Sequence, residues 1–131
     1  MYGQVPYRQF TLREGAGRCA LSLILIDTGA GIQGVLLGGE KPHIGGIVLG
    51  VPRPSLTGEG WGADLFVIPV SGHKDVELAS SLAKRLAQEL RLTVAISAGV
   101  HCERITGQEL AEIRKNCERL GDEALRVLSC D

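Results

Sequence analysis

Residues 63–98 read ADLFVIPVSGHKDVELASSLAKRLAQELRLTVAISA, and this stretch decides the fold. Ala63 to Val70 is an apolar run of strand length, and Leu92 to Ala98 is another. Between them, Asp75 to Leu90 repeats its apolar residues with the period of an amphipathic helix. A strand, a helix and a second strand predict a right-handed crossover unit with parallel strands. The apolar face of the predicted helix consists of Ala79, Leu82, Ala83, Leu86, Ala87 and Leu90.

The chain before this unit is rich in strand-forming residues. Tyr7 to Glu14, Arg18 to Asp27 and Ile32 to Leu37 are β-rich runs separated by glycine-containing turns, which predicts an antiparallel meander. A fourth strand is predicted at Ile44 to Val51. Pro52 to Gly62 contains prolines and glycines at short intervals, which predicts an extended loop that could cover a binding site as a lid.

The chain after this unit predicts a helix with a well-marked start. Thr106 and Glu109 have the spacing of a capping box, which satisfies two otherwise unpaired backbone donors. A short closing helix is predicted after Gly121. We therefore expect residues 1–131 to form a single α+β domain, in which an antiparallel β-meander continues into a β-α-β unit and C-terminal helices pack on a mixed sheet. The predicted apolar face of the last long helix is Leu110, Ile113, Cys117 and Leu120.

The composition is that of a soluble domain, because 44% of the residues are hydrophobic and 22% are charged. The net charge of −1 lacks the basic surplus that nucleic-acid binding requires, so nucleic acid is not an expected partner. The longest apolar run, Cys19 to Ile26, is too short to cross a membrane. Met1 to Pro6 lacks the features of a secretory signal, which favours the cytoplasm. The cysteines form no CxxC pair, so reduced and mostly buried thiols are expected.

All three histidines, His43, His73 and His101, lie where a predicted strand begins or ends. Ligands of sheets with helical crossovers collect beyond the carboxyl ends of the parallel strands, so the three rings could face one pocket. Alternatively, each is a separate solvated or capped loop residue. A metal site with a water as fourth ligand, supported by Glu103 or Asp75, is a further alternative and would make the chain a hydrolase. No HExxH or HxH pair supports it.

Two glycine-containing motifs carry the strongest binding signals. Gly38-Gly39-Glu40-Lys41-Pro42-His43-Ile44-Gly45-Gly46 suits a backbone that turns sharply or approaches a ligand closely, and its rigid Pro42 precedes a ring that can donate, accept or stack. A plain hairpin loop is the alternative. Ser71-Gly72-His73-Lys74-Asp75 begins the predicted helix, where free N–H groups and the charge of Lys74 would attract a phosphate or carboxylate. Alternatively, Ser71 or Asp75 caps the helix and Lys74 is solvated.

Two other residues are weaker candidates. Cys102 adjoins His101, but neighbouring strand residues point to opposite faces, so we expect Cys102 in the core rather than as a nucleophile. Trp61 lies in the predicted loop and could either stack on a flat ligand or fill space as a packing residue.

Three motifs, taken in order, carry a resemblance to a known family. They are Gly38-Gly39 with Pro42-His43-Ile44-Gly45, then Gly72-His73-Lys74-Asp75, and then Ala98-Gly99-Val100-His101 followed by Ile105-Thr106. The chain resembles the LpdD-like prenylated-flavin chaperones over most of its length, roughly from Arg18 to Leu128. The resemblance implies a fold similar to that of the proteasome assembly chaperones and a homodimer.

The resemblance also implies a function. Proteins of this kind hold reduced prenylated FMN (prFMN), or FMN, and assist the activation of a UbiD-type decarboxylase without turnover of their own. On this chain the phosphate would take the helix start at Lys74, and either Pro52 to Gly62 or a dimer partner would shield the reduced ring from oxygen. A metal-dependent hydrolase and a cofactor-free assembly chaperone remain alternatives. The implied cofactor-binding residues are Gly38, Gly39, Pro42, His43, Ile44, Gly45, Ser71, Gly72, His73, Lys74, Asp75, Gly99 and His101.

Overall fold

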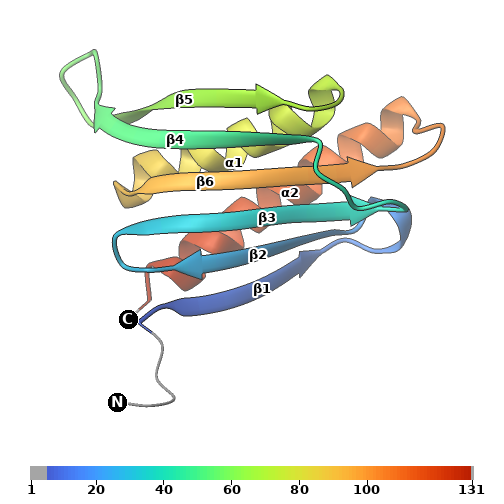
Figure 1. Cartoon of the computed structure of the whole chain (residues 1–131), viewed down its shortest axis with the longest axis horizontal. Helices are drawn as coiled ribbons and strands as arrows, with labels where there is room; N and C mark the ends of the chain where they lie inside the picture. The colour runs from blue at the N-terminus through green and yellow to red at the C-terminus, as the bar shows by residue number, and fades with distance from the viewer. Residues whose placement is uncertain (1–5, 131) are drawn as a thin grey trace.

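The computed structural model describes residues 6–130, so most of the Met1 to Pro6 segment lies outside the described residues. Within residues 6–130, six strands and two long helices make up the fold (Figure 1). In chain order the elements are β1 (Arg8–Glu14), the short 3-10 turn η1 (Gly17–Cys19), β2 (Leu21–Asp27), β3 (Gly31–Gly39), β4 (Gly46–Pro54), β5 (Trp61–Pro69), α1 (His73–Leu90), β6 (Thr93–His101) and α2 (Gly107–Leu128).

All six strands belong to one mixed sheet with the order β1-β2-β3-β6-β4-β5. The predicted meander is confirmed, because β1, β2 and β3 pair antiparallel in sequence. The predicted crossover from β5 through α1 to β6 also makes these two strands parallel, but β4 lies between them and pairs antiparallel with both. The last strand, β6, is thus inserted beside β3, to which it is parallel.

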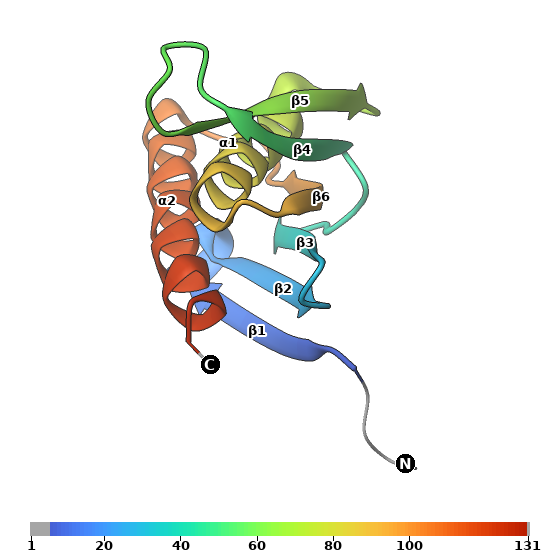
Figure 2. The ribbon, with the colours of Figure 1, turned by 90° about the vertical axis from the view of Figure 1, so that its left-hand side faces the viewer.

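Both helices lie on the same face of the sheet (Figure 2). α1 packs on β4, β5 and β6, whereas α2 packs on β1 and β2 and against α1. The α+β fold predicted from the sequence, a mixed sheet with helices packed on it, is therefore confirmed. Buried leucine, isoleucine and valine side chains fill the space between the layers. The largest of these core residues are Leu21, Leu23, Leu25, Ile32, Leu36, Val48, Leu82, Leu86, Val94, Ile96, Ile113 and Leu120.

No helix within residues 6–130 covers the opposite face of the sheet, which is called here the open face. Cross-strand partners alternate between the two faces, so one row of the open face runs from Val35 through Ser97 and Ile47 to Ile68. Their neighbours in sequence, such as Val48, point into the core. Large apolar side chains on the open face are exposed to solvent, and they are Val35, Ile47, Leu49, Phe66 and Ile68.

The predicted capping box at the start of α2 is confirmed, since Thr106 Oγ1 accepts from Glu109 N at 3.0 Å and Glu109 Oε1 accepts from Thr106 N at 3.1 Å. The predicted break at Gly121 is wrong, because α2 continues without interruption to Leu128. Gly121 is buried against α1, where an added Cβ would meet the Arg85 side chain. The glycine therefore allows close helix packing and does not end the helix.

The predicted loop from Pro52 to Gly62 is also wrong. Both prolines belong to β4, and Trp61 and Gly62 belong to β5, which leaves only residues 55–60 as a hairpin turn. β6 pairs with β4 only as far as Gly50, so one side of β4 has no strand partner beyond that point and tolerates prolines.

The hairpin turn lies at the opposite end of β4 from the β3–β4 connection (Figure 1). It therefore does not cover the histidine motifs as a lid. The Trp61 ring, at the same distant end, packs beneath the Arg91 guanidinium at 4.9 Å. Trp61 thus has a packing role in this chain and is too far along the sheet to stack on a ligand held at the histidines.

Candidate functional site

The candidate site lies at the edge of the sheet where β3, β5 and β6 end. These three strands are parallel to one another, so the residues that follow them gather there, as the sequence predicts. The structure brings two of the three histidines together, because the His43 and His101 rings are 6.2 Å apart between centroids and nearly perpendicular, at 86°. His73 begins α1 and is exposed, with no side-chain partner within residues 6–130.

The connection from β3 to β4 crosses the end of β6 because β6 lies between these strands. Glu40 N donates to His101 O at 2.7 Å on one side of β6, and Gly45 N donates to Ala98 O at 2.8 Å on the other. Gly45 O in turn accepts from Val70 N and Ser71 N, both at 3.0 Å. Residues 40–45 are therefore fixed to the ends of two strands, and we call them the crossing loop.

Three glycines of the motifs make this crossing possible. A Cβ on Gly99 would collide with the backbone carbonyl of His43, and a Cβ on Gly45 would collide with the Asp75 carboxylate. Gly39 has φ of 75° and contacts the His101 backbone. For Gly39 and Gly45 the sequence predicts a sharp turn or a close approach to a ligand, and the structure shows a close approach of the chain to itself.

Asp75 is the buried polar centre of the site, with 4% of its surface exposed. Its Oδ1 accepts from Val100 N at 2.9 Å, and its Oδ2 lies 3.3 Å from His43 Nε2. The other nitrogen, His43 Nδ1, lies 3.0 Å from Lys41 O. Lys41 O and the Asp75 carboxylate can each accept a hydrogen bond from the ring nitrogen that faces them. Ser71 Oγ is 3.5 Å from Nε2 and completes the surroundings of the ring.

The start of α1 has no side-chain cap. Gly72 is the N-cap residue, with φ of 62°, and no side chain accepts from the first-turn N–H groups. The Asp75 carboxylate is directed to Val100 and His43 instead, so neither Ser71 nor Asp75 caps the helix. Lys74 is half-buried, and its ammonium group has no ion pair within residues 6–130. The uncapped backbone donors and Lys74 thus belong to the same first turn of α1, whose Asp75 contacts His43 of the crossing loop.

The His101 ring contacts an acidic residue at the outer side of the site. His101 Nε2 lies 3.2 Å from Glu103 Oε1, and this hydrogen bond lowers the pKa of Glu103, with further help from the nearby Lys41. Glu103 N donates to Glu40 Oε1 at 3.0 Å, and Arg18 binds Glu40 in turn at 3.2 Å. Neither Arg18 nor Glu40 was predicted from the sequence as a site residue, although Glu40 lies within the Gly38 to Gly46 motif.

The remaining candidates lie beside this centre or within the core. Ile44 is 60% exposed at the turn of the crossing loop, and Gly38 packs on Leu21. Cys102 is buried, and its thiol donates to Arg18 O at 3.1 Å, which confirms the predicted core position. No group of three or more His, Cys, Asp or Glu side chains within residues 6–130 is arranged to hold a metal ion, so the three-histidine ligand set has no counterpart in that part of the chain.

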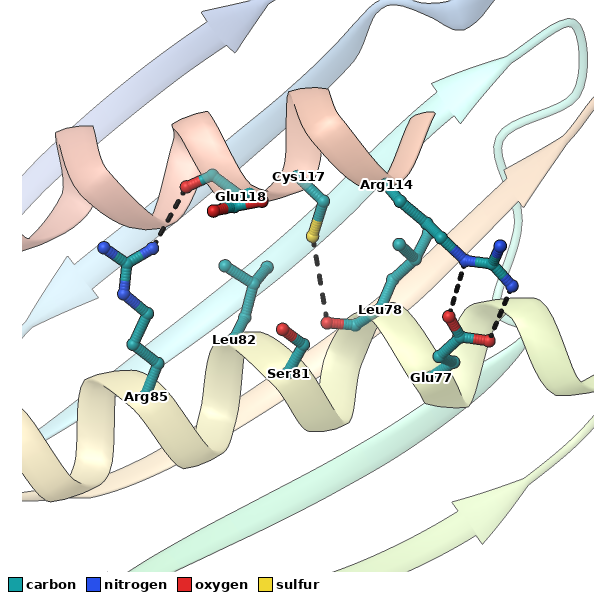
Figure 3. A pocket seen from close by; sticks show the side chains of 8 residues that line it. All are labelled: Glu77, Leu78, Ser81, Leu82, Arg85, Arg114, Cys117 and Glu118. Carbon is teal, nitrogen blue, oxygen red and sulfur yellow. Dashed lines mark hydrogen bonds and ion pairs between the residues drawn. The ribbon is translucent and has the colours of Figure 1, made fainter. Parts of the chain in front are cut away.

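A hollow of about 370 Å³ adjoins the crossing loop on the open face, between β1, β2, β3 and Pro42. Another, of about 400 Å³, lies between the two helices (Figure 3). Arg114 binds Glu77 there at 2.7 and 3.3 Å, and Arg85 donates to the backbone Glu118 O at 3.1 Å. Cys117 lies at the base of this hollow, and burial raises the pKa of this thiol to about 12. The second hollow contains none of the predicted site residues, and its groups serve helix packing.

Residues 15–129 match the family model of the prenylated flavin chaperone LpdD-like domain. The chain belongs to this family. No curated protein sequence matches the LpdD-like chain. Its fold is similar to that of a chain in the crystal structure of a novel chaperone complex for yeast 20S proteasome assembly, with a TM-score of 0.59 and 10% identity. The similarity covers 95% of this chain and 96% of the yeast chain, which confirms the predicted fold relationship.

The family assignment gives this LpdD-like domain a chaperone role in prenylated-flavin handling. No helix in residues 6–130 is long and apolar enough to cross a bilayer. The motifs that predicted the family are the ones that build the crossing loop, the start of α1 and the end of β6. The family model matches residues 15–129 as a whole, and this range includes these motifs.

Proposed function

We propose that this chain binds reduced prFMN, or FMN, at the crossing loop and the start of α1, and delivers the cofactor to a UbiD-type decarboxylase without catalysing turnover itself. The observation that supports the proposal best is the uncapped start of α1 beside Lys74. Free N–H groups at a helix start, together with an unpaired ammonium group, are the chemistry that a phosphate monoester requires.

The histidines fit the other part of such a cofactor. The side chains of His43 and His101 are 34% and 43% exposed, so both can offer hydrogen bonds to a ligand. Because the two rings are nearly perpendicular, a flat ring system can stack on only one of them. In the proposed arrangement one imidazole contacts the flavin where it passes the crossing loop, and the other donates to one of its polar groups there. When bound, the flavin is carried and protected, and the redox chemistry belongs to the client enzyme.

The proposal is tested by anaerobic purification after co-expression with a flavin prenyltransferase, followed by absorbance and mass spectrometry of the released ligand. We expect near-stoichiometric prFMN on the unaltered chain. We expect Lys74→Ala to weaken FMN binding about tenfold, the loss of one charged hydrogen bond, and to leave riboflavin binding unchanged because riboflavin lacks the phosphate.

Lys84→Ala is the matched control, because Lys84 is an exposed lysine in the middle of the same helix. Unchanged FMN binding in both Lys74→Ala and His73→Ala would contradict the phosphate position. A colourless chain with bound zinc would favour the metal-dependent hydrolase instead. A chain with neither flavin nor metal would leave a cofactor-free assembly role as the best account.

We also propose that two copies pair through their open faces as a homodimer. Five large apolar side chains are exposed there, and contiguous exposed apolar surface marks an interaction site. The helix layer already completes the core on the other face of the sheet, so the exposed apolar side chains of the open face remain available to a second copy. The paired faces would also exclude water and oxygen from a reduced ring next to the crossing loop.

Leu49→Glu is expected to convert the dimer to a monomer, because it places a charge in the centre of the paired apolar faces. The measurement is molar mass by light scattering during size-exclusion chromatography. Leu56→Glu is the control, since Leu56 is 89% exposed in the turn at residues 55–60, away from the row of apolar residues. A dimer that persists in Leu49→Glu would place the interface elsewhere.

A further inference from the structure

The hollow on the open face beside the crossing loop is called here the Arg13 hollow. Its volume of about 370 Å³ lies within the range of small-ligand pockets, roughly 300 to 1,000 Å³. Ile24 and Leu37 give it an apolar floor, and Pro42 of the crossing loop forms one wall. Gly38 and Gly39 line it with backbone alone. These features suit a flat, largely apolar body more than a small inorganic ion.

The hollow contains one charged side chain, Arg13, and two hydroxyl groups, those of Thr11 and Ser22. Within residues 6–130, the Arg13 guanidinium has neither a carboxylate partner nor a hydrogen bond, whereas Arg8, on the same strand, is bonded to Asp27 at 2.6 Å. An arginine fork on an apolar wall is well placed for a planar group with two acceptors on one edge. The guanidinium is therefore available to a ligand.

The register of the sheet connects Arg13 with the candidate site. On the open face Arg13 lies opposite Ser22, Ser22 opposite Leu37, and Leu37 opposite Gly99. The His43 backbone crosses directly over Gly99. Neighbouring strands are about 4.8 Å apart, so Arg13 and the crossing loop face each other across roughly 14 Å of sheet. A ligand in the hollow would thus lie between the free guanidinium and the crossing loop.

We infer that the Arg13 hollow holds the ring system of the flavin, with the guanidinium at the carbonyl-bearing pyrimidine edge of the ring. The inference rests on the flavin-binding function proposed above and adds a second residue set to that site. The hollow is larger than a phosphate requires, whereas the start of α1 offers donors for a phosphate. A reduced flavin carries negative charge at the same pyrimidine edge, so a cation there favours the reduced form.

The test compares the unaltered chain with Arg13→Gln. In the prenyltransferase co-expression we expect Arg13→Gln to retain much less prFMN. In titrations we expect it to bind riboflavin and FMN about tenfold more weakly, by the same factor, because both share the ring. The factor is expected to be larger for reduced FMN under anaerobic conditions. Arg13→Lys keeps the charge without the fork and should fall between the two.

Arg53→Gln is the control on the same face, because Arg53 pairs with Asp64 at the distant end of the sheet. Thermal unfolding checks that each variant is folded, which is expected because Arg13 is exposed. If the unaltered chain retains flavin and Arg13→Gln retains it equally, the ring position is wrong and the flavin function stands. If Arg13→Gln weakens FMN but spares riboflavin, the guanidinium binds the phosphate and the inference is overturned. If the unaltered chain retains no flavin, the function itself fails.

Discussion

Replacing Gly99 by alanine is expected to lower the free energy of unfolding by about 3 kcal/mol, at the upper end of the usual cost of overpacking. The new methyl group would occupy the position of the His43 carbonyl, and this neighbour is backbone rather than a flexible side chain. The crossing loop is held on both sides of β6 by Glu40 and Gly45, so it cannot move away without losing hydrogen bonds. Urea-induced unfolding measures the loss.

Gly107→Ala is the matched control for this substitution. Gly107 is the first residue of α2, and nothing lies within 4 Å of an added Cβ there. We expect its stability to change by less than about 0.5 kcal/mol. The Gly99 variant should also lose flavin, because it displaces His43. A Gly99→Ala chain as stable as the Gly107→Ala chain would show that the crossing loop does not pack on β6 as described.

Replacing Asp75 by alanine is expected to cost about 2 kcal/mol, because it leaves the buried Val100 N–H without an acceptor. Asp75→Asn is expected to restore most of this loss. Its amide oxygen can accept from Val100 N, and its amide nitrogen can donate to His43 Nε2 once that nitrogen has lost its hydrogen. The two variants therefore separate the loss of a hydrogen bond from the loss of a charge.

Nitrogen-15 NMR of the His43 ring is the decisive measurement for Asp75. In the unaltered chain we expect Nε2 to carry hydrogen, since the Asp75 carboxylate that faces it only accepts. In Asp75→Asn we expect hydrogen on Nδ1 only. Glu77→Gln, on the exposed side of the same helix, is the control and should leave the ring signals unchanged. Identical ring signals in all three chains would contradict the described His43 environment.

The parts of the fold that follow from local chemistry were predictable from the sequence. The capping box at Thr106 needs only residues three positions apart, and the helical period of Asp75 to Leu90 reflects one buried face. Gathering His43 and His101 at one edge was also predictable, because strands of one direction end together. These inferences required no knowledge of which strands are neighbours.

The parts that depend on distant partners were not predictable. A proline- and glycine-rich segment such as Pro52 to Gly62 is a loop in most contexts, and only the absence of β6 beyond Gly50 allows it to continue as strand. The requirement for a glycine at position 99 comes from the His43 carbonyl, which is far away in sequence. Nothing in the sequence around Arg13 indicated a binding residue. Its position on the open face near the crossing loop depends on strand pairing with residues that are distant in sequence.

The central place of β6 has a consequence for how the chain is made. β3 and β4 are both complete before β6 leaves the ribosome, yet neither has its inner neighbour until then. The nascent chain therefore holds two separate antiparallel pieces, β1 to β3 and β4 to β5, each with an unpaired edge. Such late, long-range pairing slows folding and exposes edges to other nascent chains. A ribosome that stalls before residue 93 would thus release a fragment that is prone to aggregate.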